Sequence, residues 1–255
     1  MNLQKAAVIA KNTFTETIRE RILYVTLAFA AVTIIATLLA GSISLGQDLR
    51  VIQSFGLTAM LVFLLVIAVF VGAQMLQRET DRKTIYLTLS KPVSRETFYL
   101  GKFAGFCSVL AVCGGIMAAV LIGLLWIKSG SFPTAAVWAT AAIILEAWLI
   151  TALGMLFGSF ATSLMSVIYT FGLIIIGHSA TTLYIISQKS APAVGYLLQT
   201  VYYLFPNLEK FNLRNDVVYA LTPDFSQALG IVGYFVGYTA LLLVLGVLVF
   251  RRHES

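Results

Sequence analysis

The sequence predicts an all-α polytopic membrane protein, with six transmembrane helices in a single domain over residues 1–255. Hydrophobic residues make up 59% of the chain and charged residues 11%, against roughly 45–50% and 25% in ordinary soluble domains. Apolar runs long enough to cross a bilayer as helices, about 17–25 residues, occur at 22–40, 56–77, 103–127, 135–158, 163–187 and 228–250. This composition excludes an ordinary soluble domain.

Residues 1–21 precede the first apolar run and predict an amphipathic connecting helix in the membrane interface. At 100° per residue, one side of this helix carries Leu3, Ala7, Ala10, Phe14 and Ile18. The opposite side carries Lys5, Asn12, Glu16 and Arg19. The alternative is a basic tail with accidental periodicity. The segment is not expected to be a cleavable signal, because the run after it is long enough to stay in the membrane.

Residues 77–103, between the second and third runs, contain nine of the charged residues in a chain that has 17 basic and 11 acidic ones. Orientation alone would need only a few basic residues, and acidic residues contribute little to it. The segment also has the pattern of two helices. The stretch 79–89 predicts a short helix that Pro92 ends, and Ser94 is a natural N-cap with Glu96 in the first turn of the next helix.

The same charged segment contains apolar residues that need something to bury them. They are Ile85, Tyr86, Leu87 and Leu89. Apolar side chains surrounded by charges are typical of a helix that fits a groove on a soluble partner. The alternative is a loop that packs on its own bundle.

Two polar residues interrupt the fourth and fifth apolar runs. Glu146 falls near the middle of the fourth run, where an ionised carboxylate is costly, so it should face the bundle interior or a wet cavity. His178 falls within the fifth run. Both are candidates for a translocation path. The alternatives are a protonated, hydrogen-bonded Glu146 or a shifted span, and a packing role for His178.

The segment 188–227 before the last run is too long for a simple turn, and its aromatic residues suit amphipathic helices at the outer interface. It could cap a substrate exit or dock a periplasmic partner. Glycine pairs spaced for close helix approach occur at 101 and 105, 154 and 158, and 233 and 237. Packing within the chain explains such pairs most simply, and one of them could form a homodimer seam.

The distribution of Lys and Arg predicts the orientation in the membrane. Segments that alternate along the chain carry twelve basic residues on one side and five on the other. By the positive-inside rule both termini and the loop at 78–102 are cytoplasmic. The net charge of +6 therefore reports orientation and headgroup contact, and no nucleic acid is expected as a partner.

The run "RETDRKTIYLTLSKPVSRETFYLGKF" resembles the first cytoplasmic loop of permeases of the type-2 ABC exporter family. The matching positions are Glu79, Arg82, Thr84, Leu89, Ser90, the stretch 92–95, Gly101 and Lys102. The run "IAKNTFTETIRERILY" looks like the connecting helix of that family. Residues 205–219 are similar to the outer loop of a sub-branch that includes the permease of nitrous oxide reductase maturation. The resemblance covers nearly the whole chain.

The resemblance implies a coupling helix over 78–102 that seats in a groove of a separate ABC ATPase, with two permease copies and two ATPases in the complex. The implied contact residues are Glu79, Arg82, Lys83, Thr84, Ile85 and Leu87. It implies a homodimer in the inner (cytoplasmic) membrane. ATP and Mg²⁺ would be bound by the partner, with no cofactor in this chain.

Motifs for catalytic chemistry do not occur in the sequence. There is no G-x-x-x-x-G-K-[ST], no G-x-S-x-G and no H-E-x-x-H. Cys107 and Cys113, six apart in one apolar run, face different ways around a helix and predict packing residues. His178 and His253 cannot form a multidentate metal site within one chain. The sequence therefore predicts a non-catalytic subunit without a metal site.

The function predicted is that of a permease subunit in an ATP-driven exporter. Two alternatives stay open: an intramembrane lipid-acting enzyme with Glu146 and His178 as acid and base, and an ion-coupled secondary transporter, which should show an inverted repeat or interrupted helices. The substrate is open among a sulfur species, a lipid, a peptide and a hydrophobic drug. Residues 188–227 contain no Met, Cys or His, the ligands that copper favours, which argues against a direct copper path.

Overall fold

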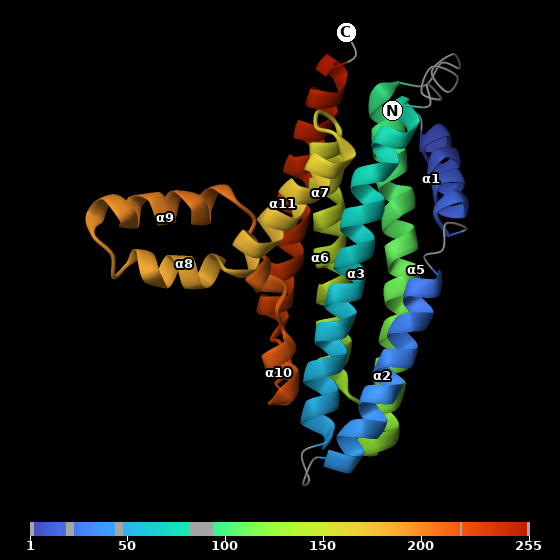
Figure 1. The fold of residues 1–255 in the computed structure, drawn as a ribbon, viewed down its shortest axis with the longest axis vertical. Coiled ribbons are helices and arrows are strands. Elements are labelled where there is room, and N and C mark those ends of the chain that lie inside the picture. The colour runs from blue at the N-terminus through green and yellow to red at the C-terminus, as the bar shows by residue number, and fades with distance from the viewer. Residues whose placement is uncertain (1–2, 19–22, 44–47, 82–93, 220, 254–255) are drawn as a thin grey trace.

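The computed structural model describes residues 3–18, 23–43, 48–81, 94–219 and 221–253, and this part of the chain is helical and contains no strand. Four helices in it are long and apolar enough to cross a membrane. They are α3 (Asp48–Asp81, through Leu49–Phe70), α5 (Arg95–Ser129), α6 (Thr134–Gly158) and α11 (Phe225–His253). Figure 1 shows them standing side by side along the long axis. All four fall on apolar runs predicted as spans.

The fifth apolar run is not one straight helix. It forms α7 (Ser163–His178) and α8 (Ala180–Ser187), which are bent by 56° at the break between them. Counted as one broken span, this pair raises the number of candidate spans to five. At the first predicted run, α2 (Leu23–Ile43) is helical over 21 residues, but several of its side chains lie outside the described set. The count of six spans therefore stays a prediction.

The N-terminal helix α1 (Leu3–Thr17) lies alongside the first half of α5 (Figure 1). Its buried positions differ from the predicted stripe: Thr13 and Thr17 are buried, while Ala7 is exposed. The reason is the surface of α5, where a Cβ added at Gly105 would lie 2.6 Å from the Ala10 carbonyl oxygen. The two helices approach closely at this point, Ile9 packs against Gly101, and Phe14 and Ile18 of the predicted stripe pack against the core. The placement of α1 in the membrane interface stays a prediction.

The N-cap predicted for α5 is confirmed. The Ser94 hydroxyl accepts a hydrogen bond from the Thr97 backbone N–H at 3.4 Å, and Glu96 lies in the first turn. The preceding helix α3 ends at Asp81. The predicted coupling residues Arg82, Lys83, Thr84, Ile85 and Leu87 lie outside the described residues, and Glu79 is described only as part of the α3 backbone.

The apolar core forms where α6 packs against α3, α5, α7 and α11. Its largest fully buried aliphatic side chains come from α3 and α5, among them Leu64, Leu110 and Met117. Trp148 ties α6 to α5 by donating from its indole N–H to the Cys107 carbonyl oxygen at 2.9 Å. Because α6 packs against these four helices, a polar side chain on α6 can be enclosed by its neighbours.

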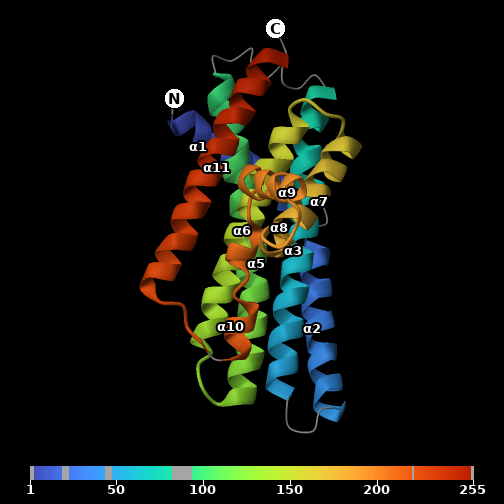
Figure 2. The ribbon, with the colours of Figure 1, turned by 90° about the vertical axis from the view of Figure 1, so that its left-hand side faces the viewer.

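The segment after α8 contains α9 (Pro192–Leu204), the 3₁₀ helix η2 (Leu208–Phe211) and α10 (Arg214–Val218). Helices α8 and α9 pack on each other as a hairpin that projects from the side of the bundle (Figures 1 and 2). We refer to residues 180–204 as the arm. The chain then returns to the bundle through η2 and α10 before α11 runs to the C-terminus, at the same end of the bundle as the N-terminus (Figure 1).

Candidate functional site

Glu146 is a carboxyl group placed inside the helix bundle. It is the thirteenth of the 25 residues of α6, and only 1% of its side chain is exposed. Placing a carboxyl group at the middle of an apolar span is costly unless it is neutral or has a partner. The local sequence offers none, because its neighbours along α6 are apolar.

The partner comes from a different helix. His178 is the last residue of α7, and its Nε2 atom lies 2.9 Å from Oε1 of Glu146. Neither atom makes a hydrogen bond of good geometry in the part of the chain that the structure describes, so the two groups lie at close range without an aligned hydrogen bond. The sequence singled out both residues separately, and the fold brings them together at the break in the fifth apolar run.

The end of α7 is also held from the opposite side, by η2. A Cβ added at Gly177 would lie 2.6 Å from Cγ of Leu208 and 2.7 Å from the Pro206 carbonyl oxygen. Leu208 and Phe211 are 0% and 1% exposed and belong to the main core. The segment around η2 therefore packs into the bundle against the residue next to His178, so the break in the span is fixed by tertiary contacts.

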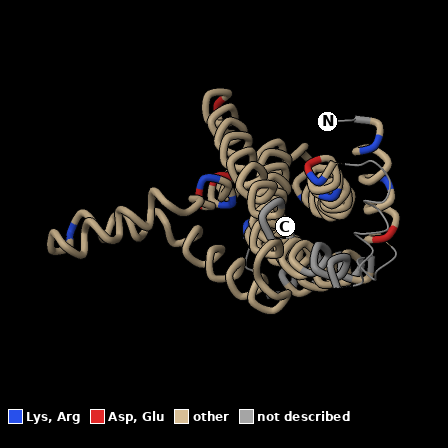
Figure 3. Tube along the Cα trace, turned by 90° about the horizontal axis from the view of Figure 1, so that it is seen from above, with Lys and Arg blue, Asp and Glu red and all other residues tan. Residues whose placement is uncertain are grey.

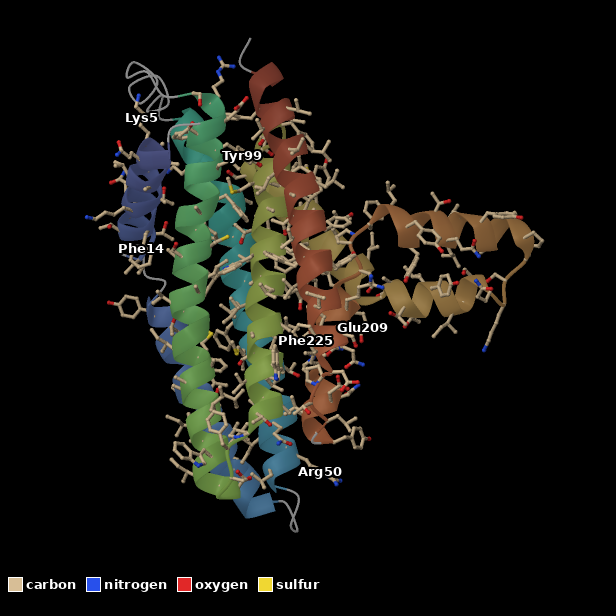
Figure 4. All side chains as sticks on the ribbon, turned by 180° about the vertical axis from the view of Figure 1, so that it is seen from behind. Lys5, Phe14, Arg50, Tyr99, Glu209 and Phe225 are labelled. Atoms are coloured by element: carbon tan, nitrogen blue, oxygen red, sulfur yellow. The ribbon has the colours of Figure 1, made fainter. Side chains whose placement is uncertain are left out.

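A chain of polar contacts connects this segment to α3. The Asn212 amide donates to Oε1 of Glu209 at 2.7 Å, and the Arg214 Nε donates to Oδ1 of Asn212 at 2.7 Å. A second guanidinium nitrogen of Arg214 donates to the Thr58 hydroxyl at 3.3 Å. Figure 4 shows Glu209 beside the bundle near the base of the arm.

The same segment is attached to α11. The Asn207 backbone N–H donates to the Tyr234 hydroxyl at 2.7 Å, and the Tyr238 hydroxyl donates to the Leu204 carbonyl oxygen at 3.0 Å. The Lys210 ammonium lies 4.1 Å from the centroid of the Tyr234 ring, a cation–π contact. Sequence reasoning assigned no role to these residues, although the concentration of Asn, Glu, Lys and Arg at 205–219 was a signal that they make contacts.

The chemistry of the site is that of one carboxyl and one imidazole in apolar surroundings. Such a pair can exchange protons or hydrogen-bond a polar group on a passing molecule. Within the described ranges no group of three or more His, Cys, Asp or Glu side chains could hold a metal ion. Cys107 and Cys113 are free thiols buried in α5. The arrangement therefore places one carboxyl–imidazole contact between α6 and α7.

The model of a protein family described as ABC-2 family transporter protein matches residues 7–255. The chain belongs to this family. Its members are multi-pass membrane components of ABC transporters, which work in general with an ABC ATPase and are typically non-catalytic themselves. No curated protein matches the chain. The buried pair, the broken span and the segment around η2 are thus features of an ABC-2 permease.

Proposed function

We propose that this permease is the transmembrane subunit of an ATP-driven exporter in the inner (cytoplasmic) membrane, in which two copies of the chain associate with two cytosolic ATPase subunits. The observation that carries the proposal is the ABC-2 family match over nearly the whole chain. The layout supports it, because α3 ends and α5 begins at the end of the bundle that carries both termini (Figure 1). The excess of basic residues favours that end as the cytoplasmic one.

The segment 78–102 would be the contact with the ATPase. It combines charged residues that set the orientation of a docked helix with apolar residues that fill a groove. The residues proposed to make this contact are Glu79, Arg82, Lys83, Thr84, Ile85 and Leu87. Because the capped start of α5 follows directly at Ser94, a tilt of this segment on ATP binding would be transmitted to α5 as a rigid rod.

Within the membrane, the Glu146–His178 pair would line the translocation path. It is supported by the burial of Glu146, by the 2.9 Å distance between Oε1 and Nε2, and by its position at the break between α7 and α8. In this conformation the two side chains contact each other. A change in the relative position of α6 and α7 would separate them, and both groups would then be free to bind a polar part of the substrate.

The test of coupling is a pull-down of tagged protein from its native membrane, followed by mass spectrometry of the proteins that co-elute. The wild-type chain should bring down an ABC ATPase, and a variant with Ile85→Asp and Leu87→Asp should lose it. Val8→Asp is the control, because Val8 is 69% exposed on α1 and lies outside the loop. Loss of the ATPase in the control as well, or its retention in the double variant, would contradict the assignment of the loop.

The test of the path is Glu146→Gln in membranes. The amide keeps the size of the side chain and its contact with His178 but cannot ionise, so transport should fall while assembly with the ATPase stays normal. A Glu146→Gln variant that assembles and transports at the wild-type rate excludes a role for this carboxyl in transport.

Two other functions have one supporting observation each. The carboxyl–imidazole pair is what an intramembrane lipid-acting enzyme would need as acid and base, and such an enzyme would act on lipid without nucleotide. The break between α7 and α8 is of the kind found in ion-coupled secondary transporters, but these have a matching break in a second repeat. Among the described helices only one bent pair passes as a span, which favours the ABC permease.

The likeness of residues 205–219 to the permease of nitrous oxide reductase maturation leads us to place the chain in that sub-branch. In this structure the stretch contains η2, and residues in and around η2 contact α7 and α11. It offers no soft ligand for copper, so the proposed cargo is not a bare copper ion. Export assays on membranes with candidate sulfur species, lipids and peptides would identify it.

A further inference from the structure

Helices α5 and α11 interlock at the end of the bundle where α5 begins. Tyr99, near the start of α5 and 0% exposed, packs its ring on Gly246 of α11. A Cβ added at Gly246 would overlap the Tyr99 hydroxyl and lie 2.7 Å from Cζ of the ring. Phe250, one turn further along α11, makes ring contacts with Phe98 and Tyr99, at 6.4 Å and 5.9 Å between centroids. The first turns of α5, which follow the proposed coupling segment, are therefore packed directly on α11.

The first half of α11 holds the segment around η2. The Asn207 backbone N–H donates to the Tyr234 hydroxyl at 2.7 Å, and the Lys210 ammonium lies 4.1 Å from the centroid of the same ring. Tyr234 also makes a ring contact with Phe211 of η2, at 6.1 Å between centroids. Figure 3 shows charged residues gathered in this segment, where the arm meets the bundle. One aromatic side chain of α11 thus makes polar and ring contacts with the segment.

This segment connects α11 to the buried pair. Helix α7 packs against α3, α6 and η2 and makes no extensive contact with α11 among the described helices. At the end of α7, a Cβ added at Gly177 would lie 2.6 Å from Cγ of Leu208 and 2.7 Å from the Pro206 carbonyl oxygen. His178 follows directly, with its Nε2 atom 2.9 Å from Oε1 of Glu146. Through this segment α11 therefore bears on the histidine side of the pair, whereas α6 carries the carboxyl side.

Helix α11 joins the two contacts as a continuous rod. It runs from Phe225 to His253 without a proline, and Gly246 and Tyr234 are twelve residues apart along it, or about 18 Å at 1.5 Å per residue. Of the four long helices it is the least buried in the chain, so few packed side chains oppose its displacement. Figure 4 shows the separation, with Tyr99 toward the chain termini and Glu209 near the base of the arm. A shift at Gly246 is therefore expected at Tyr234 as well.

We propose that α11 is the relay between the coupling segment and the Glu146–His178 pair. The relay begins where Tyr99 packs on Gly246, follows α11 to Tyr234 and passes through η2 to the end of α7. A tilt of the first turns of α5 shifts α11, and α11 shifts α7 relative to α6, which opens or closes the pair. By linkage, opening of the pair also biases the coupling segment. The inference rests on the proposed function and adds the connection between its two sites.

The test is hydrogen–deuterium exchange, read by mass spectrometry, on the full-length permease purified with the proteins that co-elute. Gly246→Ala adds a methyl group where the Tyr99 hydroxyl lies and should separate α5 from α11. We expect the amides of 174–187 and 204–211, at the far end of the relay, to exchange about threefold faster or more. Gly237→Ala, on the same helix and without a neighbour within 4 Å, should leave these rates unchanged. A change confined to 95–106 and 243–253 overturns the relay.

A compensating substitution separates the relay from a general loss of folding. The Tyr99 hydroxyl makes no hydrogen bond of good geometry in the described part of the chain, and its removal leaves space at Gly246 for a methyl group. Tyr99→Phe combined with Gly246→Ala should therefore bring exchange at 174–187 back to within about twofold of the wild type. A double variant that exchanges like Gly246→Ala alone overturns the relay.

The far end of the relay is tested at Tyr234. Tyr234→Phe removes the acceptor for the Asn207 N–H, so it should speed exchange at 174–187 and leave 95–106 unchanged. Tyr219→Phe is the control, because Tyr219 is 70% exposed and lies outside the relay. Equal exchange at 174–187 in the two variants overturns the role of Tyr234.

The working direction is tested by trapping the co-purified ATPase with ATP and vanadate. In the wild-type complex, trapping should change exchange at 174–187, and Gly246→Ala should reduce this change about threefold or more while ATP hydrolysis persists. No change in the wild type, or a change that Gly246→Ala leaves intact, overturns the relay and leaves the proposed function standing. A permease that brings down no ATPase, but whose exchange at 174–187 responds to Gly246→Ala, overturns the ATP coupling and not the mechanical connection.

Discussion

The contact between Glu146 and His178 predicts a large, non-additive loss of stability when His178 is removed. His178→Ala leaves a carboxyl group that is 1% exposed without its partner, and breaking a buried pair in this way costs about 3–5 kcal/mol. Glu146→Gln keeps an amide that can still bond the imidazole, so its cost should be near that of one hydrogen bond, about 1 kcal/mol. The double variant has no carboxyl left to isolate and should cost less than the sum.

The coupling energy between the two sites is expected to be about 2 kcal/mol, within the range of about 0.5–3 kcal/mol that contacting residues show. It would be measured by reversible unfolding in mixed micelles with increasing SDS, for the wild type, both single variants and the double variant. Glu146→Gln combined with Ser108→Ala is the control, since the Ser108 hydroxyl donates only to its own helix, at Ala104. Additive costs for the Glu146 and His178 variants would refute the reasoning.

The remaining predictions concern two close approaches of helices, each with a matched control on the same helix. Gly105→Ala forces α1 away from α5 by about 0.8 Å, the difference between the 2.6 Å contact and ordinary packing. Overpacking of this kind costs about 1–3 kcal/mol of stability and should be seen as faster proteolysis of α1. Gly115→Ala, the control on α5, should have no effect. Gly177→Ala displaces Leu208 and should reduce transport and stability together. Gly172→Ala, with no neighbour within 4 Å, should change neither. Equal effects of a variant and its control would contradict the packing described.

The helices were predictable because their lengths and ends depend on residues that are close together in the sequence. Apolar runs of span length placed α3, α5, α6 and α11, and Ser94 followed by Glu96 marked the start of α5. These features depend on residues that are neighbours along the chain. They need no knowledge of what packs against them.

The break at His178 could not be predicted in this way. No proline interrupts the run at 163–187, and the residues at the break contact Glu146 in α6 and Leu208 in η2, which are distant in sequence. The buried face of α1 was predicted in part: Phe14 and Ile18 pack against the core, but the burial of Thr13 was missed, because hydropathy does not register that Gly105 admits α1 at close range. The sequence identified both polar residues of the candidate site, Glu146 and His178. It did not predict that they pair, because their contact depends on how α6 and α7 pack.

The close packing of α1 on α5 at two glycines makes the N-terminal helix a site from which movement of α5 can be followed. Because α1 packs closely on α5 at Gly101 and Gly105, we expect the two helices to tilt together. A spin label or fluorophore at Lys11, which is exposed on α1, would therefore follow every movement of α5 without touching the loop or the membrane core. The conformational cycle of this permease can be timed from its N-terminus while the machinery stays unmodified.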